Sequence, residues 1–175
     1  MSTSYMLDLS SIEAGYKWLT EHSECFNMSK FISIRKYRDK YREEIDESGG
    51  DWNFHPYVVR TPVIPECGTT LCLAGAMLLA DALNKGEKTV LISNDSHDIL
   101  TRVLDLVEKD NPELLPLPLE LSIDLTKIFM GDIFFDREEY SHVDRMTDIR
   151  LEDLKKELDL LYNYWGHVPL MEESK

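Results

Sequence analysis

Residues 65–83 read PECGTTLCLAGAMLLADAL, and this stretch decides the fold class. From Leu71 onward the side chains are apolar in nearly every direction around a helical wheel, which is typical of a helix buried in the middle of a bundle. Gly68 allows the backbone to turn sharply, and Thr69 or Thr70 offers a hydroxyl that can cap a helix start. The stretch predicts a tight turn followed by a central core helix that starts near Thr69.

Segments on both sides of this stretch carry the spacing of amphipathic helices. Ser10 and Glu13 form a capping box, Asn94 or Asp95 can cap a second helix, and Ser122 can cap a third. We expect helices at residues 11–23, in RKYRDKYREEIDE (35–47), in SHDILTRVLDLVEKD (96–110), after Ser122 and over 147–165, with brief strands at YVV (57–59) and TVLI (89–92). The predicted fold is therefore mainly α, a single compact helical domain (1–175) with a buried central helix after the CGTT turn and at most a small strand component.

Cysteine content and the N-terminus indicate the compartment. The chain has three cysteines, an odd and sparse set that does not build a disulfide framework, so we expect free thiols in a reducing cytoplasm. The N-terminal residues lack the basic and apolar blocks of a signal peptide, and the apolar run after Cys67 is too short to span a bilayer. We expect a soluble cytoplasmic protein that does not bind membranes.

The charge of the chain is large and uneven. The formal net charge is −14; residues 1–42 hold 7 basic and 5 acidic side chains, whereas residues 43–175 hold 12 and 28. We therefore divide the domain into a basic N-terminal third (1–50), whose basic stretch with interleaved tyrosines is Arg35–Arg42, and an acidic helical body (51–170). Such a field repels nucleic acid and attracts basic surfaces, so no direct nucleic-acid binding is expected.

Cys67 is the candidate nucleophile. It precedes the predicted helix, where free backbone N–H groups and the positive end of the helix dipole lower the pKa of a thiol. A base would come from His55 or His142, and Asp132 or Asp144 could orient it. The C-x4-C spacing lacks the second pair of a zinc site, so we predict no metal and no cofactor.

The same helix start is also a candidate anion site. Its unpaired N–H groups, lined by Gly68, Thr69 and Thr70, could cradle the phosphate of a nucleotide-like ligand. The simpler alternative is that the stretch has a structural role alone: a tight turn that leads into a core helix, in which Cys72 is a small buried apolar side chain.

The stretch CGTTLCLAGA is similar to the C-G-T-x-x-C-x-x-G signature of a family of small proteins from bacteria and their phages. That family also carries F-[ND]-M upstream, matched by Phe26, Asn27 and Met28, and an L-x6-L-F element, loosely matched by LSIDLTKIFM. The chain departs from the family where Ala76 and Met77 replace an aromatic residue. The resemblance implies a compact helical fold and a phage or bacterial setting, and it adds Phe26 and Asn27 to the predicted ligand-binding residues.

Three classes of function remain after this reading. The first is a phage-encoded binding protein that engages a host protein or sequesters a small anionic ligand, in counter-defence. The second is a thiol-dependent hydrolase or transferase that uses Cys67, and the third is an acidic mimic of nucleic acid that inhibits a host enzyme. We expect a binding protein rather than an enzyme, and the aromatic residues Tyr162, Tyr164 and Trp165 leave a homodimer open.

Overall fold

The computed structural model describes residues 4–28, 32–34, 58–64, 69–93, 95–114 and 116–170. Its α-helices are α1 (Ser10–Glu21), α3 (Leu73–Asn84), α4 (Ser96–Asp110), α5 (Leu119–Met130), α6 (Ile133–Asp136) and α7 (Leu151–Trp165). Its strands are β1 (Ser4–Met6), β2 (Ile32–Ile34), β3 (Val58–Pro62), β4 (Thr69–Leu71), β5 (Thr89–Ser93) and β6 (His167–Pro169). Short 3-10 turns lie at Ser23–Cys25, Pro112–Leu114, Glu138–Tyr140 and Met146–Asp148. The mainly α class with a small strand component is confirmed.

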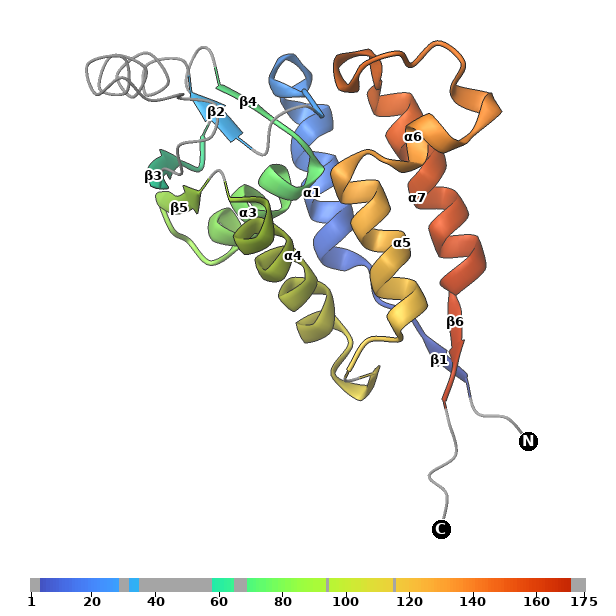
Figure 1. The fold of residues 1–175 in the computed structure, drawn as a ribbon. Helices are drawn as coiled ribbons and strands as arrows, with labels where there is room; N and C mark the ends of the chain where they lie inside the picture. The colour runs from blue at the N-terminus through green and yellow to red at the C-terminus, as the bar shows by residue number, and fades with distance from the viewer. Residues whose placement is uncertain are drawn as a thin grey trace.

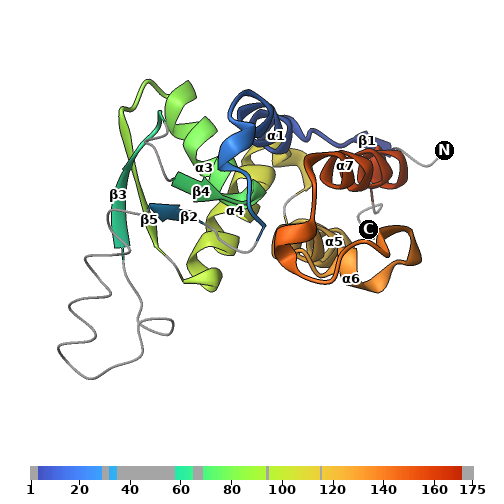
Figure 2. The ribbon, with the colours of Figure 1, turned by 90° about the horizontal axis from the view of Figure 1, so that it is seen from above.

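The described helices form two groups that meet at α1. Figure 1 and Figure 2 show α3 and α4 with the strands β2 to β5 on one side, and α5, α6 and α7 on the other. Helix α1 packs most extensively on α3 and also touches α4 and α7. One continuous set of buried apolar side chains runs through both groups, so α1 joins them into one core.

Helix α3 is the central helix that its sequence predicts. Nine of its residues are buried, on all sides of the helix. Gly15 of α1 allows the close approach, because a Cβ atom placed there would lie 2.5 Å from Cγ of Met77 and 3.0 Å from its backbone N and Cα. The helix begins at Leu73, however, and not near Thr69.

The strands form three antiparallel pairs. β1 pairs with β6, β2 pairs with β4, and β3 pairs with β5 over five residues, Val58 to Pro62. The predicted strands at YVV and TVLI therefore pair with each other where they are described. The β1–β6 pair brings the two ends of the described chain together beside α7 (Figure 1).

The helix caps differ from the prediction at three of four places. Asp95 caps α4 as expected, because its carboxylate accepts the N–H of His97 at 2.9 Å. At α1 the predicted capping box of Ser10 is wrong, because the carboxylate of Asp8 accepts a hydrogen bond from the backbone N–H of Ser10 at 2.8 Å. The caps predicted at Ser122 and at Thr69 or Thr70 are also wrong, because α5 already starts after Pro118 and α3 starts after Cys72.

Two further expectations concern helices. The predicted basic helix 35–47 lies outside the described residues. Among the described residues, no helix is both long and apolar enough to cross a membrane.

Candidate functional site

The structure brings together the two motifs that carry the family resemblance. The N–H of Asn27 donates to the carbonyl of Leu71 at 3.0 Å, and Phe26 forms a parallel bridge with the same residue. Thr69 is buried on β4 and Thr70 is half-buried there, opposite the backbone of β2. The backbone contacts of these residues link the Ser23–Cys25 turn and β2 to the core. Their role in ligand binding stays a prediction.

Thr69 and Thr70 lie on β4 and not at the start of the central helix, where the sequence analysis expected them. The first turn of α3, from Leu73 to Ala76, is buried. Cys72, which precedes this turn, is also buried, and burial raises the pKa of its thiol to about 11 although nearby backbone N–H groups lower it. Cys72 is thus a core residue, as the simpler interpretation predicted. Cys67, Gly68 and His55 lie outside the described residues.

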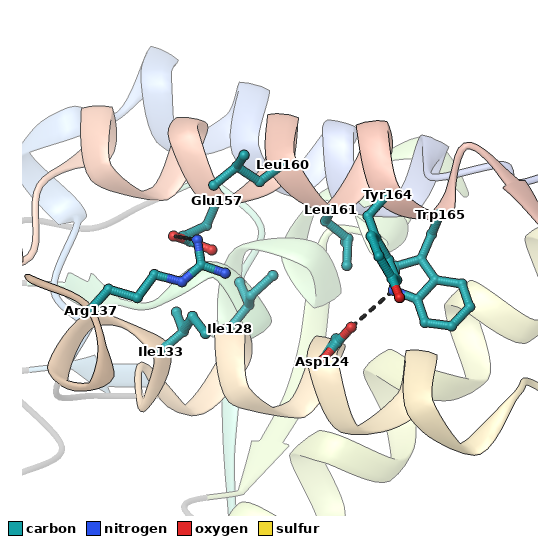
Figure 3. A pocket seen from close by; sticks show the side chains of 9 residues that line it. All are labelled: Asp124, Ile128, Ile133, Arg137, Glu157, Leu160, Leu161, Tyr164 and Trp165. Atoms are coloured by element: carbon teal, nitrogen blue, oxygen red, sulfur yellow. Dashed lines mark hydrogen bonds and ion pairs between the residues drawn. The ribbon is translucent and has the colours of Figure 1, made fainter. Parts of the chain in front are cut away.

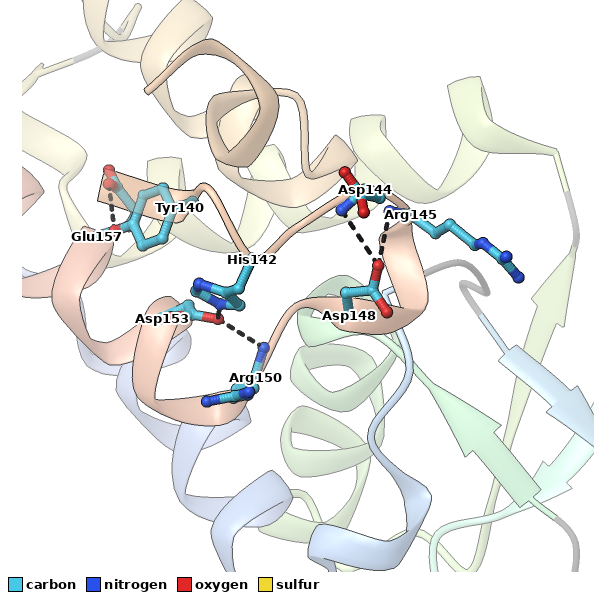
Figure 4. A network of polar contacts seen from close by, with 8 residues as sticks. All are labelled: Tyr140, His142, Asp144, Arg145, Asp148, Arg150, Asp153 and Glu157. Carbon is cyan, nitrogen blue, oxygen red and sulfur yellow. Dashed lines mark hydrogen bonds and ion pairs between the residues drawn. The ribbon is translucent and has the colours of Figure 1, made fainter. Parts of the chain in front are cut away.

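His142 has a carboxylate partner, although not one of the predicted pair. Its Nε2 lies 2.8 Å from Oδ2 of Asp153, near the start of α7 (Figure 4). The same oxygen accepts the backbone N–H of Arg150 at 2.9 Å, which closes the first turn of α7. The prediction that Asp132 or Asp144 orients this histidine is wrong, and His142 instead fastens the loop before α7 to the helix.

A second buried carboxylate on α7 holds the same loop. Oε1 of Glu157 accepts the hydroxyl of Tyr140 at 2.7 Å and lies 3.1 Å from Nη1 of Arg137 (Figure 4 shows the Tyr140 contact). Glu157 and Tyr140 are each only 2% exposed. Burial, followed by the hydrogen bond to Glu157, raises the pKa of the Tyr140 phenol. This cluster positions the guanidinium of Arg137 beside α7.

The sharp turn after α5 completes the arrangement. Gly131 has φ +78°, a left-handed conformation that ends a helix and that other residues rarely adopt. The chain then forms α6, whose Phe134 is buried and whose Phe135 is exposed, and continues to Arg137.

Between α5 and α7 lies an open groove with a volume of about 320 Å³. Its apolar lining is Ile128, Ile133, Leu160, Leu161, Tyr164 and Trp165, and its polar lining is Asp124, Arg137 and Glu157 (Figure 3). Ile128 and Leu161 are buried, whereas Leu160 is 41% and Tyr164 is 75% exposed. We call this feature the α5–α7 groove.

The two ends of the groove differ in charge. At the α6 end, Arg137 and Glu157 form an ion pair, so each already has a partner of opposite charge. At the other end, Oδ2 of Asp124 accepts the indole N–H of Trp165 at 2.9 Å, and among the described residues Asp124 makes no ion pair. The ring of Tyr164 stands edge-on to that of Trp165, with centroids 5.2 Å apart. An uncompensated carboxylate therefore lies beside two aromatic rings.

The lining determines which ligands suit the groove. It carries two carboxylates and one guanidinium, so its formal charge repels an anionic ligand such as a nucleotide. The apolar side chains and rings favour an apolar or cationic group. The described residues contain no cluster of three potential metal ligands.

Sequence reasoning missed most of this site. The sequence analysis named Tyr164 and Trp165 as a possible internal or dimer contact. It did not identify Asp124, Arg137 or Glu157 as residues of a site. One signal was available: Asp153 and Glu157 occur at helical spacing among the leucines that α7 buries, and buried acidic residues require partners.

Comparison of the chain with protein-family models, with curated proteins and with solved structures finds no match. The resemblance to the bacterial and phage family thus stays a prediction.

Proposed function

We propose that this chain is a binding protein that engages another protein, and that an exposed segment of the partner occupies the α5–α7 groove. The observation that carries the proposal is the exposure of Leu160 and Tyr164 on the wall of a concave, mostly apolar site. When a partner buries apolar side chains, the complex is stabilised by roughly 25 cal/mol for each Å² of apolar surface removed from water. Such a groove on a helical scaffold suits an extended or helical peptide segment.

Charge complementarity specifies the partner further. The net charge of −14 attracts basic proteins over long distances and accelerates their association. A second copy of this acidic chain would be repelled, and the groove itself adds an uncompensated carboxylate. The partner we propose is therefore a basic protein, and in the phage setting that the sequence resemblance implies it is a host protein.

The thiol-dependent alternative stays a prediction, because its nucleophile Cys67 lies outside the described residues. Cys25 and Cys72 are both buried, and burial raises the pKa of each thiol. His142, one of the two predicted bases, is paired with Asp153 at the start of α7.

A selection of displayed random peptides on the full chain tests the proposal. We expect enriched peptides to bind the wild type and to bind Leu160→Arg about tenfold more weakly, because the new charge replaces an apolar wall and repels a basic segment. Leu83→Arg is the matched control, since Leu83 is 47% exposed at the end of α3 and lies outside the groove lining. It should bind like the wild type.

Two results would contradict this proposal. One is a failure to enrich any peptide, or enrichment of peptides that bind Leu160→Arg as well as the wild type. The other is a dimer in sedimentation velocity that Leu160→Arg, but not Leu83→Arg, converts into a monomer, because the occupant of the groove would then be a second copy.

A further inference from the structure

The aromatic end of the α5–α7 groove differs from the rest of its lining in a way that restricts the partner. Asp124 projects from α5 toward α7, where the indole N–H of Trp165 holds one carboxylate oxygen at 2.9 Å (Figure 3). Since Trp165 is nearly buried at 9% exposure, this hydrogen bond fixes the carboxylate at the end of the groove. An ordered acceptor loses less side-chain entropy when a ligand binds than a free surface carboxylate does.

Asp124 makes no ion pair within the described structure. Arg137 lines the same groove, but it already forms an ion pair with Oε1 of Glu157 at 3.1 Å. The hydroxyl of Tyr140 donates a hydrogen bond to the same oxygen at 2.7 Å. The other lining residues are apolar or aromatic. The groove therefore has an unneutralised negative end, an apolar middle, and a neutralised ion pair at the α6 end.

The aromatic rings strengthen the preference for a cation. Tyr164 is 75% exposed and stands edge-on to Trp165, at an interplanar angle of 78°. A cation near the face of such a ring is attracted to it, and more strongly as water is removed from the site. A carboxylate that is held in place beside exposed aromatic surface is a suitable site for an ammonium or guanidinium group on an apolar stem.

From this arrangement we infer that the α5–α7 groove selects a lysine or arginine side chain of the partner, whose charged group pairs with Asp124 beside Tyr164 and Trp165 and whose stem lies along Ile128 and Leu161. The assignment depends on the proposed function, because it names the residue class that the bound segment must present. It adds a specificity that net charge alone does not give: a basic residue is required at one fixed position of the segment.

The first part of the test uses the peptides selected on the wild type. We expect them to share a lysine or arginine at one position, spaced from an apolar residue that fills the middle of the groove. Failure to enrich any peptide would refute the proposed function. Enrichment of peptides that bind at Leu160 but share no basic position would leave the proposed function standing and refute this inference alone.

The second part compares a synthetic peptide with the same peptide carrying norleucine at the basic position. The wild type should bind the norleucine peptide about tenfold more weakly, the loss expected for one ion pair with aromatic contact. Asp124→Asn, whose amide oxygen still accepts the N–H of Trp165, should bind both peptides equally. Asp105→Asn on α4 removes the same charge from an exposed position outside the groove and should discriminate like the wild type.

An equal loss with the wild type and with Asp124→Asn would overturn the inference, because the basic residue would then bind elsewhere. Should Asp124→Asn fail to fold, the salt dependence of the wild type decides. Binding of the basic peptide should weaken as salt rises from 50 to 500 mM, and binding of the norleucine peptide should not. The same salt dependence for both peptides would refute the pairing with Asp124.

Discussion

The α1–α3 contact and the α5–α7 contact are both packings of two helices, but they use their side chains differently. At α1–α3, Gly15 lets the backbone of Met77 approach directly, and α3 is buried on every side. At α5–α7, the helices remain separated by an open groove of about 320 Å³, and buried carboxylates on α7 hold a loop against it. The first contact is closed by direct packing at Gly15, whereas the second keeps polar and aromatic groups accessible.

The most distinctive stretch of sequence thus leads into the core, and the groove that we propose as the binding site lies elsewhere. The CGTTLC motif leads into a core helix, and burial of its Cys72 raises the thiol pKa to about 11. The groove is built by an amphipathic helix pair of ordinary composition.

A side chain added where α1 and α3 lie closest together should have the largest effect on the free energy of unfolding. Gly15→Ala would place a methyl group 2.5 Å from Cγ of Met77 and 3.0 Å from its backbone, so the helices must move apart. We expect a loss of about 3 kcal/mol in the free energy of unfolding, measured with urea. Gly86→Ala is the comparison: it has open space but a φ of +76°, so it should cost about 1 kcal/mol. Equal costs would mean that α1 and α3 are not tightly packed.

Removing the hydroxyl group that donates a hydrogen bond to the buried carboxylate of Glu157 should have the second largest effect on the free energy of unfolding. Tyr140→Phe leaves Glu157 buried with Arg137 as its remaining side-chain partner, and we expect a loss of about 2 kcal/mol. Tyr164→Phe, at a tyrosine that is 75% exposed, should change the free energy of unfolding by less than about 0.5 kcal/mol. If Tyr140→Phe is equally mild, the cluster does not hold the loop that carries Arg137.

The same tyrosine should make stability depend on alkaline pH. Because the pKa of Tyr140 is raised in the folded state, the folded protein retains this proton at a pH where the unfolded chain has lost it. Its contribution is complete below the ordinary phenol pKa of about 10 and is lost as the pH rises toward the folded-state value. Above pH 10, the free energy of unfolding should thus fall more steeply for the wild type than for Tyr140→Phe. Parallel curves would contradict this.

Exchanging sulfur for oxygen at Cys72 should have the smallest effect. Cys72→Ser puts a hydroxyl into a buried apolar site, and we expect a loss of about 1–2 kcal/mol. In the folded wild type, iodoacetamide at pH 8 should alkylate Cys72 far more slowly than a free thiol, since little thiolate forms. Fast alkylation of Cys72 under native conditions, read by mass spectrometry, would move the motif back among the reactive sites.

The sequence was informative where structure depends on neighbours along the chain. The apolar spacing of α4 and α7 and the Asp95 cap follow local rules, and they are present. The cap of α1 was mispredicted because the carboxylate of Asp8 accepts the N–H of Ser10, and that of α5 because the helix already begins after Pro118, so that Ser122 lies inside it. Local propensity does not rank such competing caps.

The groove was hardly predictable, because its contacts join residues far apart in the chain. Trp165 reaches back 41 residues to Asp124, and Tyr140 reaches forward 17 residues to Glu157. The hydrophobic periodicity of each segment predicts a helix, but it does not predict which distant segment that helix contacts. Only the charged residues on the apolar face of α7 pointed to it.

The most direct test of the central claim is to locate the bound segment. Labelled wild-type protein is titrated with a selected peptide, and backbone and indole N–H signals are followed by NMR. The account predicts shifts in α5, α6 and α7, including the indole signal of Trp165, and unchanged signals in β4 and α3. Shifts confined to Asn27, Thr69 and Thr70, with the indole of Trp165 unaffected, would place binding at the motif and contradict the account.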